Sequence, residues 1–357
     1  MGRTNQGNDA VPVSVLNIHI GLPKTGTTSL QVFCARQRSW LAAQGLYYPA
    51  TMRAPMPTSS QHRYINAAMR AQFADGGHGG DHALAMLAQE ISRQNLRNAL
   101  ISEEQFSYDS ARSAPFLARL RAQFNVRILV FLRQQDQWAE SMYAQAVRGG
   151  YRHDFAAFLA AQATRERLHA ADFLAIWAAS FGAENLRVGL YRGGQNCAQA
   201  LALLGLPAFD GPPPERFNPS LPGEAIMFMR GLRRVPPDLY PRFNTLFAGV
   251  LAGLCDPAPF TGFTPAARLD FAARHAGANR RAAALWPVLQ GLNATDLRDD
   301  PLTPAMPPAR RLALLRALVR ETGCKPPGIG PTSGINAQIS AYESMLAQAC
   351  AAQSQAA

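Results

Sequence analysis

The pattern of apolar and polar positions divides the chain into an alternating part and a helical part. Short apolar runs of the buried-strand type lie at 13–20, 98–102, 126–132 and 186–191. Segments with apolar residues at helical spacing lie at 27–44, 82–96, 113–124, 136–149, 154–163, 169–181 and 196–205. This alternation of strand and helix predicts an α/β fold, a parallel sheet with helices on both faces.

The pattern becomes mostly helical after a proline-rich link at 206–222. Helices are predicted at 222–234, 238–254, 265–288, 307–322 and 335–351. We therefore expect a core at 13–222 that is extended, within the same domain, by a helical part at 223–351. Disordered segments are expected at 1–12 and 352–357.

A glycine- and threonine-rich turn follows the first predicted strand, Gly21-Leu22-Pro23-Lys24-Thr25-Gly26-Thr27-Thr28-Ser29-Leu30. A strand, a tight loop and a helix N-terminus together form a geometry that cradles phosphate, because backbone N–H groups and the helix dipole both favour an anion. The chain has 35 basic residues, of which only Lys24 and Lys325 are lysine. The turn thus predicts a phosphate-bearing ligand that Lys24 contacts.

The turn differs from a Walker A loop, G-x-x-x-x-G-K-[ST]. Gly21 and Gly26 have the required spacing, but Thr27 occupies the lysine position and the lysine lies three places upstream. The run Pro23-Lys24-Thr25-Gly26-Thr27-Thr28-x-Leu30 resembles the 5′-phosphosulfate-binding loop of sulfotransferases, which use 3′-phosphoadenylyl sulfate (PAPS) as the sulfate donor. The resemblance implies a P-loop-like fold in which Pro23, Lys24, Thr25, Gly26, Thr27, Thr28 and Ser29 bind this donor.

A second segment fits the same family. The apolar strand at 126–132 ends in Arg133, and the helix that follows carries Ser141. These two residues resemble the family's 3′-phosphate site, since arginine can engage phosphate bidentately and a serine hydroxyl adds a neutral donor. The stretch 143–150 is similar to one in bacterial sulfotransferase-like proteins.

The acceptor must lose a proton, so a histidine or glutamate is expected within hydrogen-bond reach of it. Bacterial relatives show a strand that ends in Ser-Ser-Glu, and here Ser102-Glu103-Glu104 follows the strand at 98–102. Glu104 matches the family's glutamate, while Glu103 replaces its second serine. His62, on the long connection after the tyrosines at 47 and 48, is the rival base because imidazole has a suitable unperturbed pKa. The residues themselves do not choose among these three.

Two further candidate sites, one for a metal and one for late phosphate contacts, have weaker support in the sequence. His78 and His82 have metal-ligand spacing but no partner cluster, so no metal is expected. The late Arg-Lys-Gly triplet of eukaryotic cytosolic members is missing, and Arg280 and Arg281 are the substitutes available for late phosphate contacts.

Composition is that of a globular enzyme. The chain has 357 residues, 48% of them hydrophobic, and five scattered cysteines without a C-x-x-C motif, which indicates a reducing compartment. No signal peptide or bilayer-spanning run is seen, so we expect a cytoplasmic protein. The net charge of +11 suits a doubly phosphorylated donor and an anionic acceptor, and it permits contact with an anionic membrane surface. No nucleic-acid-binding motif accompanies it, so no nucleic-acid partner is expected.

The sequence is therefore interpreted as a PAPS-dependent sulfotransferase. Lys24 and Glu104 or His62 are the expected catalytic residues, and transfer is expected in line, without a required metal. By resemblance to bacterial relatives, the acceptor is a hydroxyl on a glycan or glycolipid. Two alternatives are a P-loop nucleotide-dependent kinase or NTPase and a non-catalytic family member that binds nucleotide.

Overall fold

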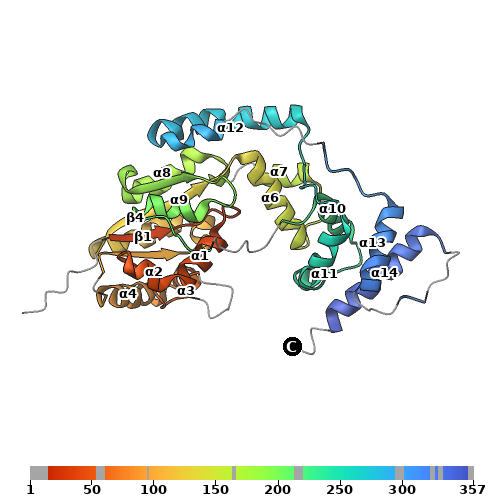
Figure 1. Ribbon diagram of the computed structural model, residues 1–357, viewed down its shortest axis with the longest axis horizontal. Coiled ribbons are helices and arrows are strands. Elements are labelled where there is room, and N and C mark those ends of the chain that lie inside the picture. The colour runs from red at the N-terminus through yellow and green to blue at the C-terminus, as the bar shows by residue number, and fades with distance from the viewer. Residues whose placement is uncertain are drawn as a thin grey trace, which may run out of the picture. The chain divides into compact units, whose positions relative to one another are not determined.

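The computed structural model describes residues 15–53, 61–94, 96–162, 166–212, 220–293, 301–321, 326–328 and 333–352 (Figure 1). The chain forms two compact units, each built from separate stretches of sequence. The first comprises 1–134, 165–217 and 275–294, and the second comprises 135–164, 218–274 and 295–357.

The first unit is organised around a five-stranded sheet in which every neighbouring pair of strands is parallel. Its strands lie in the order β2-β3-β1-β4-β5. The bounds are Val15–His19 for β1, Leu46–Tyr47 for β2, Asn98–Ser102 for β3, Asn125–Leu132 for β4 and Leu186–Leu190 for β5. At the carboxyl end of β1, His19 lies opposite Ser102 of β3 and Leu129 of β4. The loop after β1 therefore starts level with the end of β3 and beside β4, at the carboxyl side of the sheet, where open parallel sheets bind ligands.

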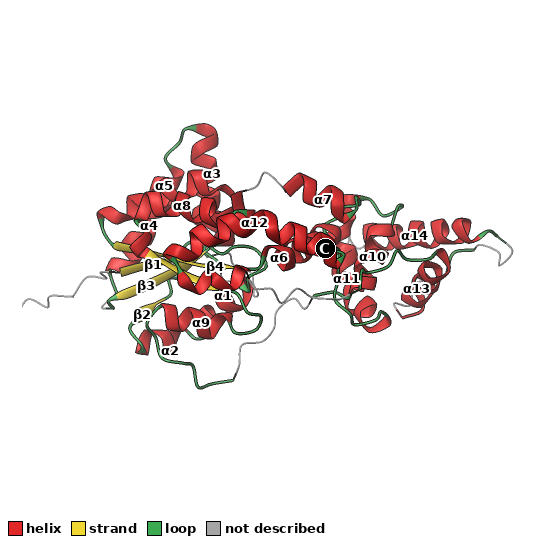
Figure 2. Cartoon of the chain, turned by 90° about the horizontal axis from the view of Figure 1, so that it is seen from above, coloured by secondary structure: helices red, strands yellow, loops and turns green. Residues whose placement is uncertain are grey.

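Helices cover both faces of this sheet. They are α1 (Thr27–Arg36), α2 (Arg38–Ala43), α3 (Arg63–Asp75), α4 (Gly79–Ser92), α5 (Ser110–Ala118), α8 (Ala170–Phe181) and α9 (Asn196–Leu203). Figure 2 shows α2 and α9 on one face and α4, α5 and α8 on the other. On the first of these faces a buried apolar cluster joins helices to strands, through residues such as Phe33, Leu41, Leu129, Phe131 and Leu201. The predicted α/β fold with a central parallel sheet flanked by helices is confirmed.

The second unit is helical, with bounds Gln135–Arg148 for α6, Phe155–Gln162 for α7, Gly223–Gly231 for α10, Tyr240–Leu254 for α11, Pro308–Glu321 for α13 and Ile335–Ala352 for α14. Helix α12 (Pro265–Leu285) is divided between the units at His275. Tyr143 of α6 packs edge-on against Phe155 and Phe158 of α7, with ring centroids 5.3 and 5.5 Å apart. Arg268 is fully buried and pairs with Asp136 and Glu140, so its charge is compensated inside the unit.

Short 3-10 helices complete both units, at Glu104–Asp109, Arg119–Ala122, Glu166–Leu168, Ala183–Asn185, Pro237–Leu239 and Pro287–Asn293.

Some details of the predicted elements differ from the structure, and strand β2 is not among the predicted strands. The helix predicted at 27–44 is interrupted at Gln37, which lies between α1 and α2. The connection at 50–80, for which no element was predicted, contains helix α3. Its apolar residues, among them the buried Ile65 and Met69, are spaced at i and i+4 and could have indicated this helix. The expected disordered segment 1–12 and all but the first residue of 352–357 lie outside the described residues.

Candidate functional site

The loop between β1 and α1 turns sharply through left-handed backbone conformations. Gly21, Lys24 and Gly26 have φ angles of 47°, 64° and 76°. Such angles are routine for glycine but uncommon for a residue with a side chain, so Lys24 is held in its conformation by its surroundings. Within the turn, the Thr25 hydroxyl donates to the carbonyl of Leu22 at 2.5 Å.

The two glycines of the loop are also required by close packing. A Cβ atom at Gly26 would lie 2.4 Å from the side-chain nitrogen of Asn196, and one at Gly21 would lie 3.0 Å from the Cα of Glu104. Asn196 begins α9 and donates its amide to the carbonyl of Gly26 at 2.6 Å. The loop is therefore a preformed cradle that two other segments support.

The start of α1 offers donors to an anion. The first amide bonded in the helical pattern is that of Leu30, which donates to the carbonyl of Gly26 at 3.2 Å. The amides of Thr27, Thr28 and Ser29 precede it, and the first helical turn has no acidic residue and no side-chain cap. The positive end of the helix dipole is thus available to a phosphate or sulfate group at the loop predicted to bind one.

The carboxyl end of β3 brings two glutamates to this loop. Glu103 is fully buried, and its Oε1 accepts the amide of Gln105 at 2.8 Å, which caps the 3-10 helix that follows. Burial raises the pKa of Glu103 to about 7, against the lowering effect of that amide. The pKa of Glu104 is also raised by burial, while the cationic side chains of Lys24 and Arg167 lower it in part. Glu104 therefore belongs to a small charged group around the loop.

Arg167, which the sequence did not indicate, is a buried member of this group. Its guanidinium lies 4.2 Å from the centre of the Tyr108 ring, and only 7% of the residue is exposed. Arginine at this position places a permanent positive charge close to Glu104. The residue follows a predicted helix without any motif, so its role could not be found from local pattern.

Arg133 lies after β4, as predicted, and supports the loop directly. Its Nη1 donates to the main-chain carbonyl of Lys24 at 3.0 Å. Its guanidinium also lies 5.3 Å from the centre of the Tyr191 ring, which follows β5. The ends of β1, β4 and β5 are thus linked through one arginine side chain. Ser141, the other residue expected at a 3′-phosphate site, lies on α6 in the second unit.

His62 is fully buried against β3 and is held by two main-chain hydrogen bonds. Its amide donates to the carbonyl of Ser102 at 2.8 Å, and its Nδ1 accepts the amide of Ser102 at 3.1 Å. Burial lowers the pKa of His62 to about 3, so the ring is neutral. A neutral ring that accepts at Nδ1 carries its proton at Nε2.

A buried polar network fixes the end of β1 below the loop. The Ser102 hydroxyl contacts Nδ1 of His19 at 2.7 Å and accepts the side-chain amide of Gln31 at 3.1 Å. The amide of Glu103 donates to the carbonyl of His19 at 3.0 Å. Burial lowers the pKa of His19 to about 3, which keeps this network uncharged. These contacts tie β1, α1 and β3 together at the site.

The other residues singled out in the sequence lie elsewhere. Arg281, a candidate for late phosphate contacts, forms an exposed ion pair with Asp172 at 3.5 Å. His78 lies 3.7 Å from Asp81 at the exposed start of α4. In the part of the chain that the structure describes, no group of three or more histidine, cysteine, aspartate or glutamate side chains is arranged to hold a metal ion. No helix among the described residues is long and apolar enough to span a membrane.

Comparisons of the sequence with known families and curated proteins find no match. Among solved structures, the chain is similar to the crystal structure of a sulfotransferase from Alicyclobacillus acidocaldarius. The two are 16% identical, with a TM-score of 0.43, and the similarity covers 75% of this chain and 94% of that chain. The function is therefore inferred from the loop and the residues around it.

Proposed function

We propose that this protein is a sulfotransferase, which moves a sulfuryl group from PAPS to an acceptor hydroxyl. The observation that carries the proposal is the preformed loop after β1, in which a left-handed Lys24 lies between two obligatory glycines at the start of an uncapped helix. Lysine at this point of the loop is the feature that separates it from a Walker A motif.

The residues present fit a phosphosulfate. The amides of Thr27, Thr28 and Ser29 precede the first hydrogen bond of the helical pattern, and an anion at the helix start would meet both these donors and the dipole. Lys24 adds a compact charge with three donors, which would stabilise the negative charge that develops on the leaving phosphate. When bound, the donor supplies a sulfuryl group that is activated by its link to phosphate.

Glu104 is the residue that we propose as the general base. It is only half-buried, and its raised pKa and its cationic neighbours place an ionisable carboxylate beside the loop. In the reaction, the acceptor hydroxyl gives its proton to Glu104 as its oxygen forms a bond to sulfur. The bond between sulfur and the bridging phosphate oxygen breaks, which leaves adenosine 3′,5′-bisphosphate.

The two rival bases are less suited to this step. The Nδ1 lone pair of His62 is occupied by the Ser102 amide, and its Nε2 already carries a proton in the neutral ring. Glu103 is fully buried and is engaged as the cap of the following 3-10 helix. Both residues are therefore assigned to the support of the β3 end.

Arg133 is proposed to act in two ways. It holds the carbonyl of Lys24, which positions the loop, and its guanidinium provides further donors for a phosphate of the nucleotide. Ser141, which lies on α6, stays a proposed 3′-phosphate donor by resemblance alone. A glycan or glycolipid hydroxyl remains the acceptor class that we propose, and the net charge of +11 favours an acceptor that is already anionic.

The proposal is tested by incubating the protein with PAPS and pooled glycan and glycolipid acceptors, and by measuring adenosine 3′,5′-bisphosphate and sulfated product by mass spectrometry. Acceptor-dependent formation of both products, lost in Lys24→Ala, is the expected result. Nucleotide binding without any sulfated product across the acceptor pool would favour the non-catalytic alternative.

A further inference from the structure

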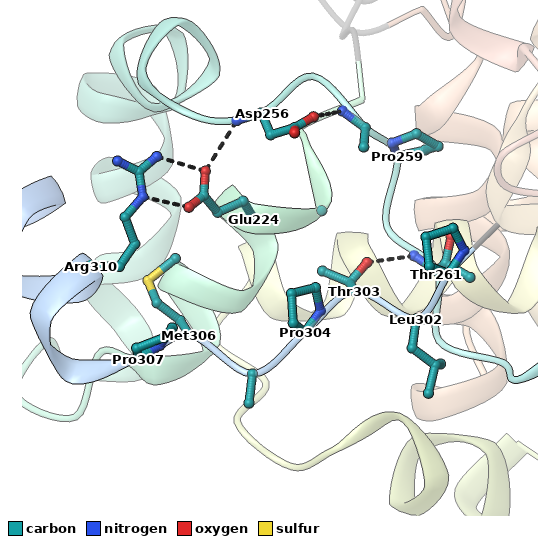
Figure 3. A pocket seen from close by; sticks show the side chains of 14 residues that line it. Glu224, Asp256, Pro259, Thr261, Leu302, Thr303, Pro304, Met306, Pro307 and Arg310 are labelled. Atoms are coloured by element: carbon teal, nitrogen blue, oxygen red, sulfur yellow. Dashed lines mark hydrogen bonds and ion pairs between the residues drawn. The ribbon is translucent and has the colours of Figure 1, made fainter.

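A cavity of about 480 Å³ lies within the second unit. Figure 3 shows its walls, which come from the start of α10, from the segment after α11 and from the segment 301–310 that leads into α13. This volume lies in the range of about 300–1,000 Å³ that is typical of small-molecule sites. The cavity is separate in sequence from every residue of the proposed donor site.

One wall of the cavity is apolar and conformationally restricted. The run Pro301-Leu302-Thr303-Pro304-Ala305-Met306-Pro307 contains three prolines in seven residues. Each proline has a fixed φ and lacks an N–H group, so the wall has few backbone donors to satisfy and little freedom to lose on binding. Leu302 remains 44% exposed, which leaves apolar surface for a ligand to cover.

Hydrogen bonds on the inner side hold this wall in place. Thr303 donates its amide to the carbonyl of Thr261 at 3.0 Å and accepts the Thr261 amide on its hydroxyl at 2.8 Å. Gly223 donates to the carbonyl of Ala258 at 2.8 Å, and a Cβ atom there would lie 2.8 Å from the Thr303 hydroxyl. The cavity is therefore built by three segments in fixed contact.

One end of the cavity is polar and carries a net negative charge. Glu224 and Arg310 form a bidentate ion pair at 2.6 and 2.8 Å, and Arg310 lowers the pKa of Glu224. Asp256 donates its amide to Glu224 at 3.1 Å and accepts the Ala258 amide on Oδ1 at 2.9 Å. Because the guanidinium is neutralised by Glu224, the charge of Asp256 is not balanced among the lining residues.

We propose that this cavity binds a small single-chain amphiphile whose apolar chain lies along the 301–307 wall and whose hydroxyl or ammonium group contacts Asp256. The apolar wall would contribute by burial of the chain. The excess carboxylate favours a neutral or cationic head group and disfavours an anionic one, although the protein as a whole is strongly basic. This site is independent of the sulfuryl transfer proposed above.

Three probes with the same chain test the proposal, namely n-octylamine, 1-octanol and octanoate, each titrated into the full-length protein without any nucleotide. Binding is followed by saturation-transfer NMR and calorimetry. Octylamine and octanol are expected to bind, and octanoate about ten-fold more weakly than octylamine. Asp256→Asn keeps an oxygen that can accept the Ala258 amide, and it is expected to reduce the preference of octylamine over octanoate.

A matched pair of variants locates the site. Ala305→Phe fills the cavity from its exposed wall, and it is expected to abolish binding of all three probes. Ala266→Phe introduces the same ring at an exposed position of α12 outside the lining, and it is expected to bind as the wild type does. Unchanged binding in Ala305→Phe, no binding of any probe to the wild type, or tighter binding of octanoate than of octylamine would each overturn the proposal.

Discussion

Arg133 donates a hydrogen bond from Nη1 to the main-chain carbonyl of Lys24 at 3.0 Å, and so it supports the one loop residue with a side chain that has a left-handed φ. The contact joins the end of β4 to the loop after β1. It gives this arginine a structural task that is distinct from direct contact with a ligand. Arg133 therefore both holds the loop in its conformation and places a positive charge beside it.

This contact predicts that Arg133→Ala weakens adenosine 3′,5′-bisphosphate binding more than loss of a remote charge would. We expect a loss of about ten- to one-hundred-fold, because both the loop support and a charged donor are removed. Arg133→Lys keeps the charge without the planar fork and is expected to recover only part of the affinity. Calorimetry on these variants, with the exposed Arg112→Ala as the control, checks the prediction. Equal losses in Arg133→Ala and Arg112→Ala would show that only net charge matters.

The two glycines at 26 and 45 provide a matched test of the cradle. Both have strongly positive φ angles, 76° and 79°, but a Cβ at Gly26 would collide with Asn196 while one at Gly45 meets nothing within 4 Å. Each alanine variant should lose about 1–2 kcal/mol of unfolding free energy to backbone strain. Gly26→Ala should lose more and should also lose bisphosphate binding, whereas Gly45→Ala should retain it. Denaturant unfolding and calorimetry measure both effects, and intact binding in Gly26→Ala would contradict the cradle.

The raised pKa of Glu103 predicts that the stability of the protein depends on pH in a specific way. Burial raises the pKa of Glu103 from 4.5 to about 7, so the folded protein keeps a proton that the unfolded chain releases. The free energy of unfolding should therefore receive a contribution that is full below pH 4.5 and is lost as pH rises to about 7. Glu103→Gln, which can still accept the Gln105 amide, should lack this loss and become relatively more stable at pH 8. Denaturant midpoints of both proteins across this range decide the matter, and parallel pH profiles would contradict the assignment.

If Glu104 is the general base, substitutions at Glu104 and at the adjacent Glu103 should affect turnover differently. Glu104→Gln should lower turnover by about 10²–10⁴-fold with little change in bisphosphate affinity, because it removes proton transfer and keeps shape. Glu103→Gln and His62→Asn should retain most of the turnover of those molecules that fold, since both residues are placed in a supporting role. Initial rates normalised to the bisphosphate-binding fraction separate the two effects. A loss in His62→Asn as large as that in Glu104→Gln would return His62 to the role of base.

Much of the first unit follows from local pattern in the sequence. The four longer strands are mostly apolar runs, and their alternation with helices suffices to predict a parallel sheet. The two-residue strand β2 has too few residues to produce a period, and it exists because Leu46 and Tyr47 pair with β3. Helix α3 is not among the predicted elements, although its buried Ile65 and Met69 have helical spacing.

Residues of the candidate site could be singled out from the sequence only where they belong to a motif. Lys24 and Arg133 could be singled out because each follows an apolar strand. In the structure Arg133 donates a hydrogen bond to the main chain of Lys24. Asn196 contacts the loop at Gly26, and Arg167 lies near Glu104, in both cases across a long sequence separation. Nothing near them in the chain therefore indicates their role. The protonation state of His62 likewise depends on the Ser102 amide, a partner that only the fold supplies.

The central claim, that the loop at Lys24 binds the nucleotide of a sulfate donor, is tested most directly by calorimetric titration. Adenosine 3′,5′-bisphosphate and ATP with magnesium are titrated separately into the wild type and into Lys24→Ala. Micromolar binding of the bisphosphate, at least about ten-fold tighter than that of ATP with magnesium and weakened in Lys24→Ala, is the predicted result. A preference for ATP with magnesium, or bisphosphate binding that is indifferent to the loss of Lys24, would contradict the account and favour a nucleotide kinase or NTPase.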